Sequence, residues 1–234
     1  QSFIRGRRNR PIIIREMENL DPEEIRKFNE MASIWWDPNG GFKALHDINP
    51  TRLDYILSRV SEPLSAVLDV GCGGGILTES LEAHTKEIMG IDAAPKPLRV
   101  AQLHAVDKAL EIDYRLTTAE ILSRDYQCHF DMVTCMELLE HITDFHSTVQ
   151  ACADLTRPGG NLFFSTINRT PISFFKLIVG AEEILKILPR GTHEYQKFIK
   201  PSELASAIRS ANLELLDLSG ISYNPFTCLL YTSP

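Results

Sequence analysis

Short apolar runs alternate with stretches of helical periodicity along most of this chain. The apolar runs predict six strands, at about residues 66–70, 87–91, 112–116, 130–135, 161–167 and 213–218. The stretches between and after them predict helices at about residues 77–83, 97–108, 119–126, 137–155 and 201–210. Strand and helix in strict alternation are typical of a parallel sheet. We therefore expect an α/β fold with a doubly wound, mostly parallel sheet and helices on both faces.

Two further helices are predicted ahead of the first strand, as an N-terminal helical extension. Asp21 can cap the first helix, and Glu24, three residues later, completes a capping box. Asn49 and Pro50 repeat a cap-and-proline start, which predicts a second helix over about residues 50–60.

The composition is that of an ordinary globular protein, with 44% hydrophobic and 24% charged residues in 234. The apolar runs are broken by charges well short of a membrane span. Five of the 24 basic residues are arginines within the first 15 positions, which leaves 19 basic against 31 acidic residues in the rest. A body this acidic is a poor partner for a phosphate backbone, so we expect no nucleic-acid substrate.

The domain organisation follows from length and charge. We expect a basic disordered leader over residues 1–19, which could instead be the end of a mitochondrial presequence, and a single domain over 20–234. The five cysteines include no CxxC pair, so a reducing compartment fits better than a disulfide framework.

A glycine-rich turn, Gly71-Cys72-Gly73-Gly74-Gly75, follows the first predicted strand. Glycines let the backbone approach a ligand closely, and the carboxyl ends of strands are where α/β sheets bind ligands. A dinucleotide-binding GxGxxG motif would need glycine where Ile76 stands. Asp92 ends the next strand, and a carboxylate there can accept both hydroxyls of a ribose.

This GxGxG turn, Asp92 and the later Arg157-Pro158-Gly159-Gly160 turn together resemble the motifs of class I S-adenosylmethionine (SAM) methyltransferases. Longer stretches resemble one family, the ubiquinone-biosynthesis O-methyltransferases, over about residues 20–226. They include Trp35-Trp36-Asp37, Leu45-His46-Asp47-Ile48-Asn49-Pro50, Cys135-Met136-Glu137-Leu138-Leu139-Glu140-His141 and Lys197-Phe198-Ile199-Lys200-Pro201.

The resemblance implies a seven-stranded, Rossmann-like sheet and an enzyme that uses SAM. That enzyme would methylate phenolic hydroxyls of polyprenylated intermediates at both O-methylation steps, on a 2-polyprenyl-6-hydroxyphenol and on a 3-demethylubiquinol. After Phe226 the sequence departs from the family, so we expect the last strand to be truncated. The alternatives are a methyltransferase of a water-soluble small molecule, a non-catalytic SAM-binding module and an NAD-linked oxidoreductase.

The resemblance places Arg52, Gly71, Asp92 and Met136 at SAM-binding positions, and Gly73 in the same glycine turn is a further cofactor-binding candidate. A guanidinium at Arg52 can fork onto the methionine carboxylate, although an arginine on a helix is more often a solvated surface charge. The deformable side chain of Met136 can lie against the adenosyl group or simply fill the core.

The candidate catalytic residues are His141 and Glu137, and the candidate metal ligands are Glu137, Glu140 and His141. On a helix these three would share one face, and such a set can hold a divalent cation, Mg²⁺ or Zn²⁺, that favours the phenolate. The resemblance supports them as metal ligands in part of the family. His141 could instead act as general base without a metal, or all three could be structural. Glu120 and His193 are weaker candidates, near the adenine and the acceptor respectively.

A helical insert over residues 168–200 interrupts the α/β pattern. Its segment 171–189 is apolar nearly all round and carries basic residues, Arg169, Lys176, Lys186 and Arg190, on or beside it. Such a helix suits either the surface of an anionic membrane or a lid over the substrate. We expect a cytoplasmic, peripheral enzyme on the inner face of the bacterial inner membrane, with other ubiquinone-biosynthesis proteins as potential partners; the alternative is the matrix face of the mitochondrial inner membrane.

Overall fold

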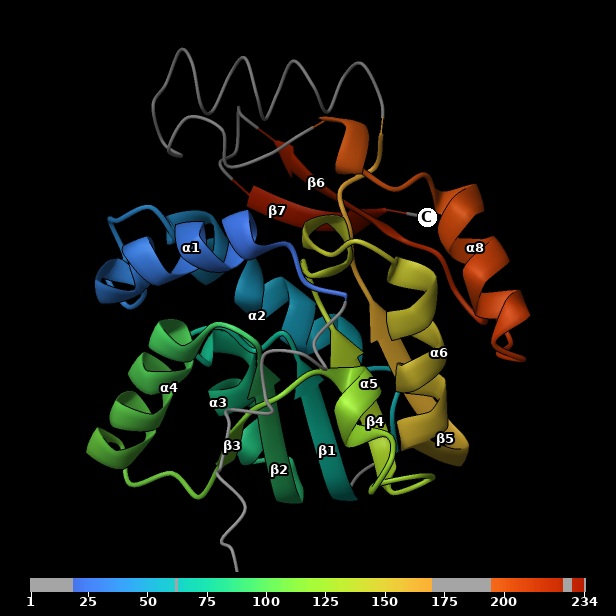
Figure 1. Cartoon of the computed structure of the whole chain (residues 1–234), viewed down its shortest axis with the longest axis horizontal. Coiled ribbons are helices and arrows are strands. Elements are labelled where there is room, and N and C mark those ends of the chain that lie inside the picture. The colour runs from blue at the N-terminus through green and yellow to red at the C-terminus, as the bar shows by residue number, and fades with distance from the viewer. Residues whose placement is uncertain (1–18, 62, 170–194, 225–228, 234) are drawn as a thin grey trace, which may run out of the picture.

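The computed structural model describes residues 19–61, 63–169, 195–224 and 229–233, and its centre is a parallel sheet (Figure 1). The strands of the sheet have the order β3-β2-β1-β4-β5 and are all parallel. The chain adds strands on one side of β1 up to β3 and then on the other side from β4, which confirms the predicted doubly wound fold. Its strands are β1 Leu64–Val70, β2 Thr85–Asp92, β3 Asp113–Leu116, β4 Phe130–Cys135 and β5 Thr156–Phe164.

The two faces of the sheet are covered by different helices because side chains alternate along each strand. On one face, Leu68 and Val70 pack in a core with side chains of α5 Ala119–Leu122, α6 Phe145–Leu155 and α8 Pro201–Ser210. On the other face, Val67 packs with Ile56 and Leu81 from α2 Lys43–Leu57 and α3 Ile76–Glu82, and α4 Pro95–Asp107 packs beside β3. Each fully buried aliphatic side chain of this kind stabilises the fold by about 1.5–3 kcal/mol.

The N-terminal extension begins with α1 Pro22–Met31, followed by a short 3₁₀ helix, η2 Ala32–Ile34, and then α2. Asp21 caps α1 as predicted, accepting a hydrogen bond from the Glu23 amide at 2.9 Å. The predicted capping role of Glu24 is wrong, because its carboxylate bonds to side chains outside the first turn instead. Figure 1 shows α1 at the same end of the central sheet as the β6–β7 pair.

Helix α2 begins at Lys43 rather than at the predicted proline start, and Pro50 lies inside it. Asn49 does not cap a helix. Its side-chain amide donates to Ser80 Oγ at 2.8 Å and to the Ile76 carbonyl at 3.4 Å, both on α3. Contacts between the two helices therefore hold α2 continuous across a residue that would end an isolated helix.

The predicted helix over residues 137–155 is two elements. Glu137 has a left-handed backbone, with φ of 53°, and only Leu139–His141 form a short 3₁₀ turn, η3. Helix α6 starts anew at Phe145, where Asp144 accepts a hydrogen bond from the His146 amide at 3.0 Å. The apolar periodicity suits one long helix, but the left-handed Glu137 and the capping residue Asp144 break it into two elements.

The predicted strand over residues 213–218 is wrong: within the described residues this stretch pairs with no other strand. Three of its leucines, Leu215, Leu216 and Leu218, lie at the surface, with Leu216 79% exposed, while Leu213 is partly buried against the core. Instead β6 Gly220–Asn224 and β7 Leu229–Ser233 form a separate antiparallel pair, and a 3₁₀ turn, η5 Tyr195–Lys197, precedes α8. Residues 170–194, the bulk of the expected membrane insert, and leader residues 1–18 lie outside the described residues.

Among the described helices, none has the length and apolar character that crossing a membrane requires. Arg169, expected near lipid headgroups, forms an ion pair with Glu203 of α8. Its guanidinium also reaches the Gln196 carbonyl at 3.4 Å.

Candidate active site

A pocket opens at the carboxyl ends of β1, β2 and β4, and its far wall is the N-terminal extension. The empty space in it is about 1190 Å³, with open solvent at its mouth included. Most of the predicted site residues line it: Arg52, Gly71, Gly73, Asp92, Met136, Glu137 and His141.

The glycine turn after β1 has a backbone that few other residues could adopt. Gly71 and Gly73 have φ of 73° and 54°, in the left-handed region that favours glycine. A Cβ on Gly73 would lie 2.2 Å from the ring of Trp35, so the bare backbone here accommodates a side chain of the N-terminal extension. Trp35 in turn stacks on Phe42, with ring centroids 3.9 Å apart. Trp35 also lines the pocket, but its place in an apolar helical pattern gave no sign in the sequence that it is more than a core residue.

Asp92 is held against this turn by two backbone amides. Its Oδ2 accepts from Gly73 at 2.8 Å and its Oδ1 from Ala94 at 2.7 Å. Burial raises the pKa of this carboxyl, while the amide hydrogen bonds act in the opposite direction. Each carboxylate oxygen keeps a second lone pair, so the group can still accept the two hydroxyls of a ribose.

Arg52 is buried, with 7% of its surface exposed, so the alternative of a solvated surface charge is wrong. Its Nη2 donates to Glu137 Oε1 at 3.2 Å. Its Nε is buried and finds no hydrogen-bond partner within the described part of the chain. A buried cation with an unused donor at the pocket wall fits an anionic ligand group such as the carboxylate of SAM.

Glu137 and Glu140 do not share a face, because Glu137 precedes the 3₁₀ turn and is held by the end of β5. Its amide donates to Ser165 Oγ at 3.0 Å, and that hydroxyl donates to Glu137 Oε1 at 2.6 Å. Glu140 is 2% exposed, does not line the pocket and accepts from Thr166 at 3.2 Å. Burial and the nearby charge of Glu137 raise the pKa of Glu140 to about 7.

His141 lies at the pocket wall with its ring fixed by α1. Its Nδ1 is 2.9 Å from Glu24 Oε2, and Phe28 meets the imidazole edge-on, with ring centroids 5.1 Å apart. Glu24 was not predicted as a site residue. It stands three residues after the N-cap Asp21, where an acidic residue is already explained by helix capping.

Of the two weaker candidates, only Glu120 lies among the described residues. Glu120 also lines the pocket, but its Oε1 already accepts from Asn19 at 2.8 Å and from Thr148 at 2.6 Å. It thereby anchors the start of the N-terminal extension to α6. His193 lies outside the described residues. Met136 lines the pocket and also packs at the edge of the core beneath it.

Comparison with known proteins decides the family. A family model described as a methyltransferase domain matches residues 45–218. The ubiquinone biosynthesis O-methyltransferase of Hahella chejuensis is 54% identical over 209 residues, covering 89% of this chain and 88% of that protein. Its namesake from Marinobacter nauticus is 51% identical over 212 residues, covering 90% and 89%. The chain belongs to the ubiquinone biosynthesis O-methyltransferase family.

Solved structures similar to this family member share its fold at low sequence identity. Magnesium protoporphyrin IX methyltransferase from Synechocystis superposes with a TM-score of 0.64 at 16% identity, covering 86% of this chain and 90% of that one. A possible histamine N-methyltransferase from Thermotoga maritima gives 0.62 at 14% identity, covering 91% and 92%. These likenesses confirm the SAM-methyltransferase fold.

In this chain the predicted metal ligands are not gathered. The described residues contain no group of three His, Cys, Asp or Glu side chains placed to hold a cation. Glu137 bonds to Ser165, Glu140 to Thr166 and His141 to Glu24. The predicted metal face required one helix over residues 137–141, and the left-handed Glu137 removes it. As placed, these three side chains do not converge into one ligand set within the described part of the chain.

Proposed function

We propose that this chain methylates phenolic hydroxyls of polyprenylated intermediates in ubiquinone biosynthesis, at both O-methylation steps, with SAM as donor. Family membership at more than 50% identity supports the reaction class. One structural observation supports the assignment of the site: a single pocket joins the Gly71–Gly73 turn and Asp92 to His141. Cofactor and acceptor can therefore meet in one space.

The cofactor side of the pocket is proposed to consist of Arg52, Asp92 and the glycine turn. Asp92 accepts the ribose hydroxyls, and Arg52 pairs with the carboxylate of the methionine part. When bound, SAM supplies a methyl group whose bond to sulfur breaks as the phenol oxygen attacks, with the electron pair staying on sulfur.

The acceptor side is proposed to centre on His141. Apolar side chains of α1 and of the loop after β4 line the pocket beside it, including Ile25, Phe28, Leu138 and Ile142. They exclude water from an aromatic ring, while His141 takes the proton of the phenol that is methylated.

A divalent cation at Glu137, Glu140 and His141 is a separate hypothesis that rests on the family resemblance. One observation favours it: the buried Glu140 Oε1 has no hydrogen-bond partner within the described residues. In the described structure each of the three side chains bonds to another residue. Methyl transfer measured after EDTA treatment, with and without added Mg²⁺, tests the hypothesis; full activity in a metal-free preparation contradicts it.

Peripheral binding to an anionic membrane through residues 171–189 is also part of the proposal. Its support is the sequence of that segment, which is apolar nearly all round, with Lys176 and Lys186 beside Glu182 and Glu183 within it and Arg169 and Arg190 flanking it. A polyprenyl substrate is itself lipid-soluble, so an enzyme at the inner face of the bacterial inner membrane, or the matrix face of the mitochondrial one, would reach it in place.

The deciding experiment compares methyl transfer to a short-chain prenylated catechol and to the unprenylated ring, alongside calorimetry with S-adenosylhomocysteine and with NADH. We expect transfer with preference for the prenylated acceptor, and binding of S-adenosylhomocysteine but not NADH. Preference for the bare ring would favour a methyltransferase of water-soluble molecules. Binding without transfer to either ring would indicate a SAM-binding module.

A further inference from the structure

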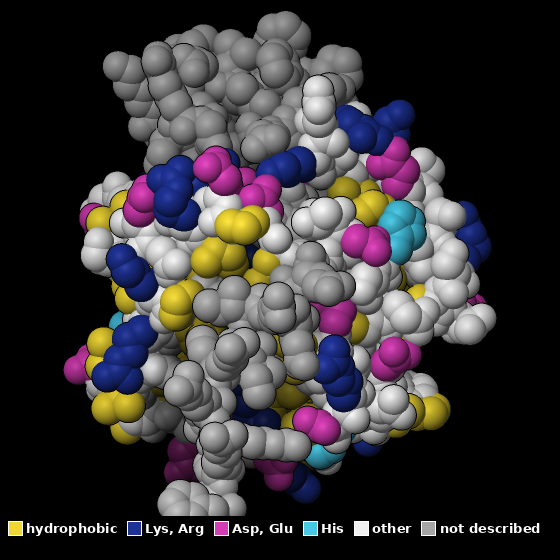
Figure 2. Space-filling model, in the orientation of Figure 1, with side chains coloured by type: hydrophobic (Ala, Val, Ile, Leu, Met, Phe, Trp, Pro, Cys, Tyr) yellow, Lys and Arg dark blue, Asp and Glu magenta, His cyan; other side chains and the backbone are white. Residues whose placement is uncertain are grey.

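The carboxylate of Glu24 on α1 lies between His141, the candidate base, and two lysines. His141 and one of the lysines, Lys197, are far from α1 in the sequence. Glu24 is buried, with 4% of its surface exposed, in a helix whose other acids, Glu23 and Glu30, lie at the surface. Acidic and basic side chains lie together on the surface over this part of the molecule (Figure 2). The Oε2 atom of Glu24 is 2.9 Å from His141 Nδ1. A buried charge is costly unless it is paired, so this burial needs a reason beyond helix capping.

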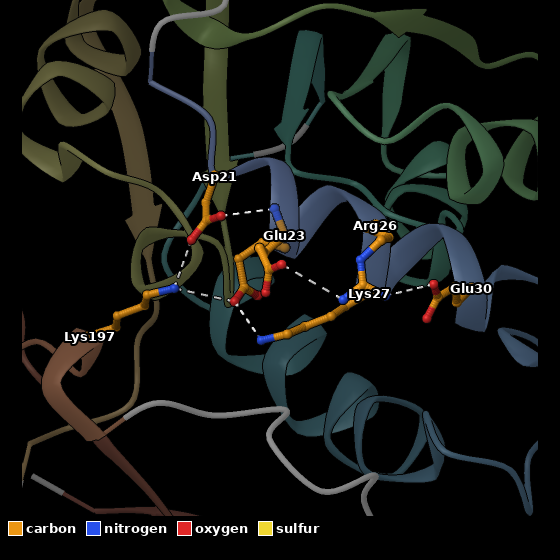
Figure 3. A network of polar contacts seen from close by, with 7 residues as sticks. Asp21, Glu23, Arg26, Lys27, Glu30 and Lys197 are labelled. Atoms are coloured by element: carbon orange, nitrogen blue, oxygen red, sulfur yellow. Dashed lines mark hydrogen bonds and ion pairs between the residues drawn. The ribbon is translucent and has the colours of Figure 1, made fainter.

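The second carboxylate oxygen is held by two cations from different parts of the chain. Oε1 lies 3.0 Å from Lys27 Nζ, one turn along α1, and 3.3 Å from Lys197 Nζ (Figure 3). Lys197 also bonds to Asp21 Oδ2 at 2.9 Å, so it holds the start of α1 as well. With one oxygen held by lysines and the other on His141, the carboxylate has little freedom to turn.

We propose that Glu24 is a positioning residue for the methyl transfer, holding His141 in the tautomer and orientation that a general base needs. This inference rests on the proposed function and extends it to the N-terminal extension. A carboxylate beside Nδ1 requires the proton to be on that nitrogen, which leaves the lone pair on Nε2 to accept the phenol proton. The same negative charge stabilises the imidazolium that forms. Phe28, edge-on to the ring, limits its rotation.

The test uses purified full-length chain and the prenylated catechol assay, with Glu24→Gln as the main variant. Glutamine keeps the shape but removes the charge, and its amide can donate to Nδ1 and so favour the wrong tautomer. We expect kcat to fall about tenfold or more, since acid–base steps carry effects of that size or larger. The acceptor KM and the affinity for S-adenosylhomocysteine should stay within about twofold, because the proposed role of Glu24 concerns the proton on His141 rather than either binding step. Glu24→Asp keeps the charge and should restore part of the rate.

Glu23→Gln is the matched control, since Glu23 is the neighbouring acid on α1 with a 74% exposed side chain. It should leave kcat unchanged. The double variant with His141→Ala separates positioning from a structural role. If Glu24 acts through His141, Glu24→Gln should lower kcat no further in the His141→Ala background. Thermal unfolding checks that each variant is folded. If Glu24→Gln does not fold, Glu24→Asp takes its place in the comparison with and without His141→Ala.

Three results would overturn the proposal: an unchanged kcat in Glu24→Gln, a full additional loss on top of His141→Ala, or a loss confined to S-adenosylhomocysteine binding. Failure of the proposed function looks different, because the unaltered chain would then transfer no methyl group to the prenylated catechol. If His141→Ala kept the rate of the unaltered chain, His141 would not be the base and Glu24 would have no positioning role. The assignment as a methyltransferase would be unaffected.

Discussion

A methyl group added at Gly73 should destabilise the protein strongly, because two separate effects coincide there. The backbone has φ of 54°, and the left-handed region costs a residue with a Cβ about 1–2 kcal/mol. The new Cβ would also lie 2.2 Å from Trp35, whose ring is 5% exposed and stacked on Phe42, so it cannot move aside freely. Overpacking of this kind costs about 1–3 kcal/mol. We expect Gly73→Ala to lower the free energy of unfolding by about 2–5 kcal/mol in all.

Gly159 offers the control for the backbone effect alone. It has φ of 80°, and a Cβ built on it meets nothing within 4 Å. Gly159→Ala should therefore lose only about 1–2 kcal/mol. Urea denaturation of both variants, followed by circular dichroism, gives the difference between them, which is the contribution of the Trp35 contact. Calorimetry with S-adenosylhomocysteine should show weaker binding for Gly73→Ala only, because a shift of the Gly73 backbone would displace the amide that donates to Asp92.

A double variant checks the assigned cause. Trp35→Ala removes the ring and is itself destabilising, but in the Gly73→Ala background it should cost less, by about the 1–3 kcal/mol of overpacking that it relieves. If Gly73→Ala and Gly159→Ala lose the same stability within about 0.5 kcal/mol, the reasoning from the Trp35 contact is refuted.

Three more predictions concern binding, pH and the membrane. Asp92→Ala should weaken S-adenosylhomocysteine binding by roughly 1.5–3 kcal/mol, the scale of hydrogen bonds to a charged group, as measured by calorimetry. Burial raises the pKa of Glu24, but hydrogen bonds from His141 and Lys27 outweigh it and lower that pKa to about 2. The stability that Glu24 contributes is therefore complete above about pH 4.5 and is lost as the pH falls toward 2, so urea titrations over that window should show a shallower acid loss in Glu24→Gln. Replacing Phe174, Leu177 and Ile178 by Ser should release the chain from anionic liposomes in a sedimentation assay with nucleoside affinity unchanged; continued co-sedimentation would exclude residues 171–189 as the anchor.

The order and type of the central elements were predictable because local signals and tertiary structure agree there. Apolar runs ending in Gly71 and Asp92 mark strands whose carboxyl ends meet, so their positions along the chain were enough to place both at one pocket. The errors occur where a contact distant in sequence overrides a local pattern. Asn49 and Pro50 have the signature of a helix start, but the packing of α2 on α3 carries the helix through them.

The candidate site was predictable in its cofactor half and less so in its catalytic half. The turn and Asp92 carry their own spacing signature. Glu137, Glu140 and His141 were read on the assumption of one helix, and a single left-handed residue sends their side chains to different partners. Glu24 and Trp35 contribute to the pocket only through folding of α1 and η2 over the sheet, and nothing local to either residue distinguishes it from a helix cap or a core aromatic.

The packing of the extension on the glycine turn also provides an optical probe. The chain has two tryptophans, and both touch this turn. Trp35 lies over Gly73 and Gly74, while Trp36 donates from Nε1 to the Gly74 carbonyl at 2.9 Å and stacks on His104 at 3.6 Å. Intrinsic fluorescence therefore reports on one place, the seam between the N-terminal extension and the turn, without any added label. Undocking of that extension would change the emission while the circular dichroism of the sheet stayed constant, so local opening over the pocket can be timed separately from global unfolding.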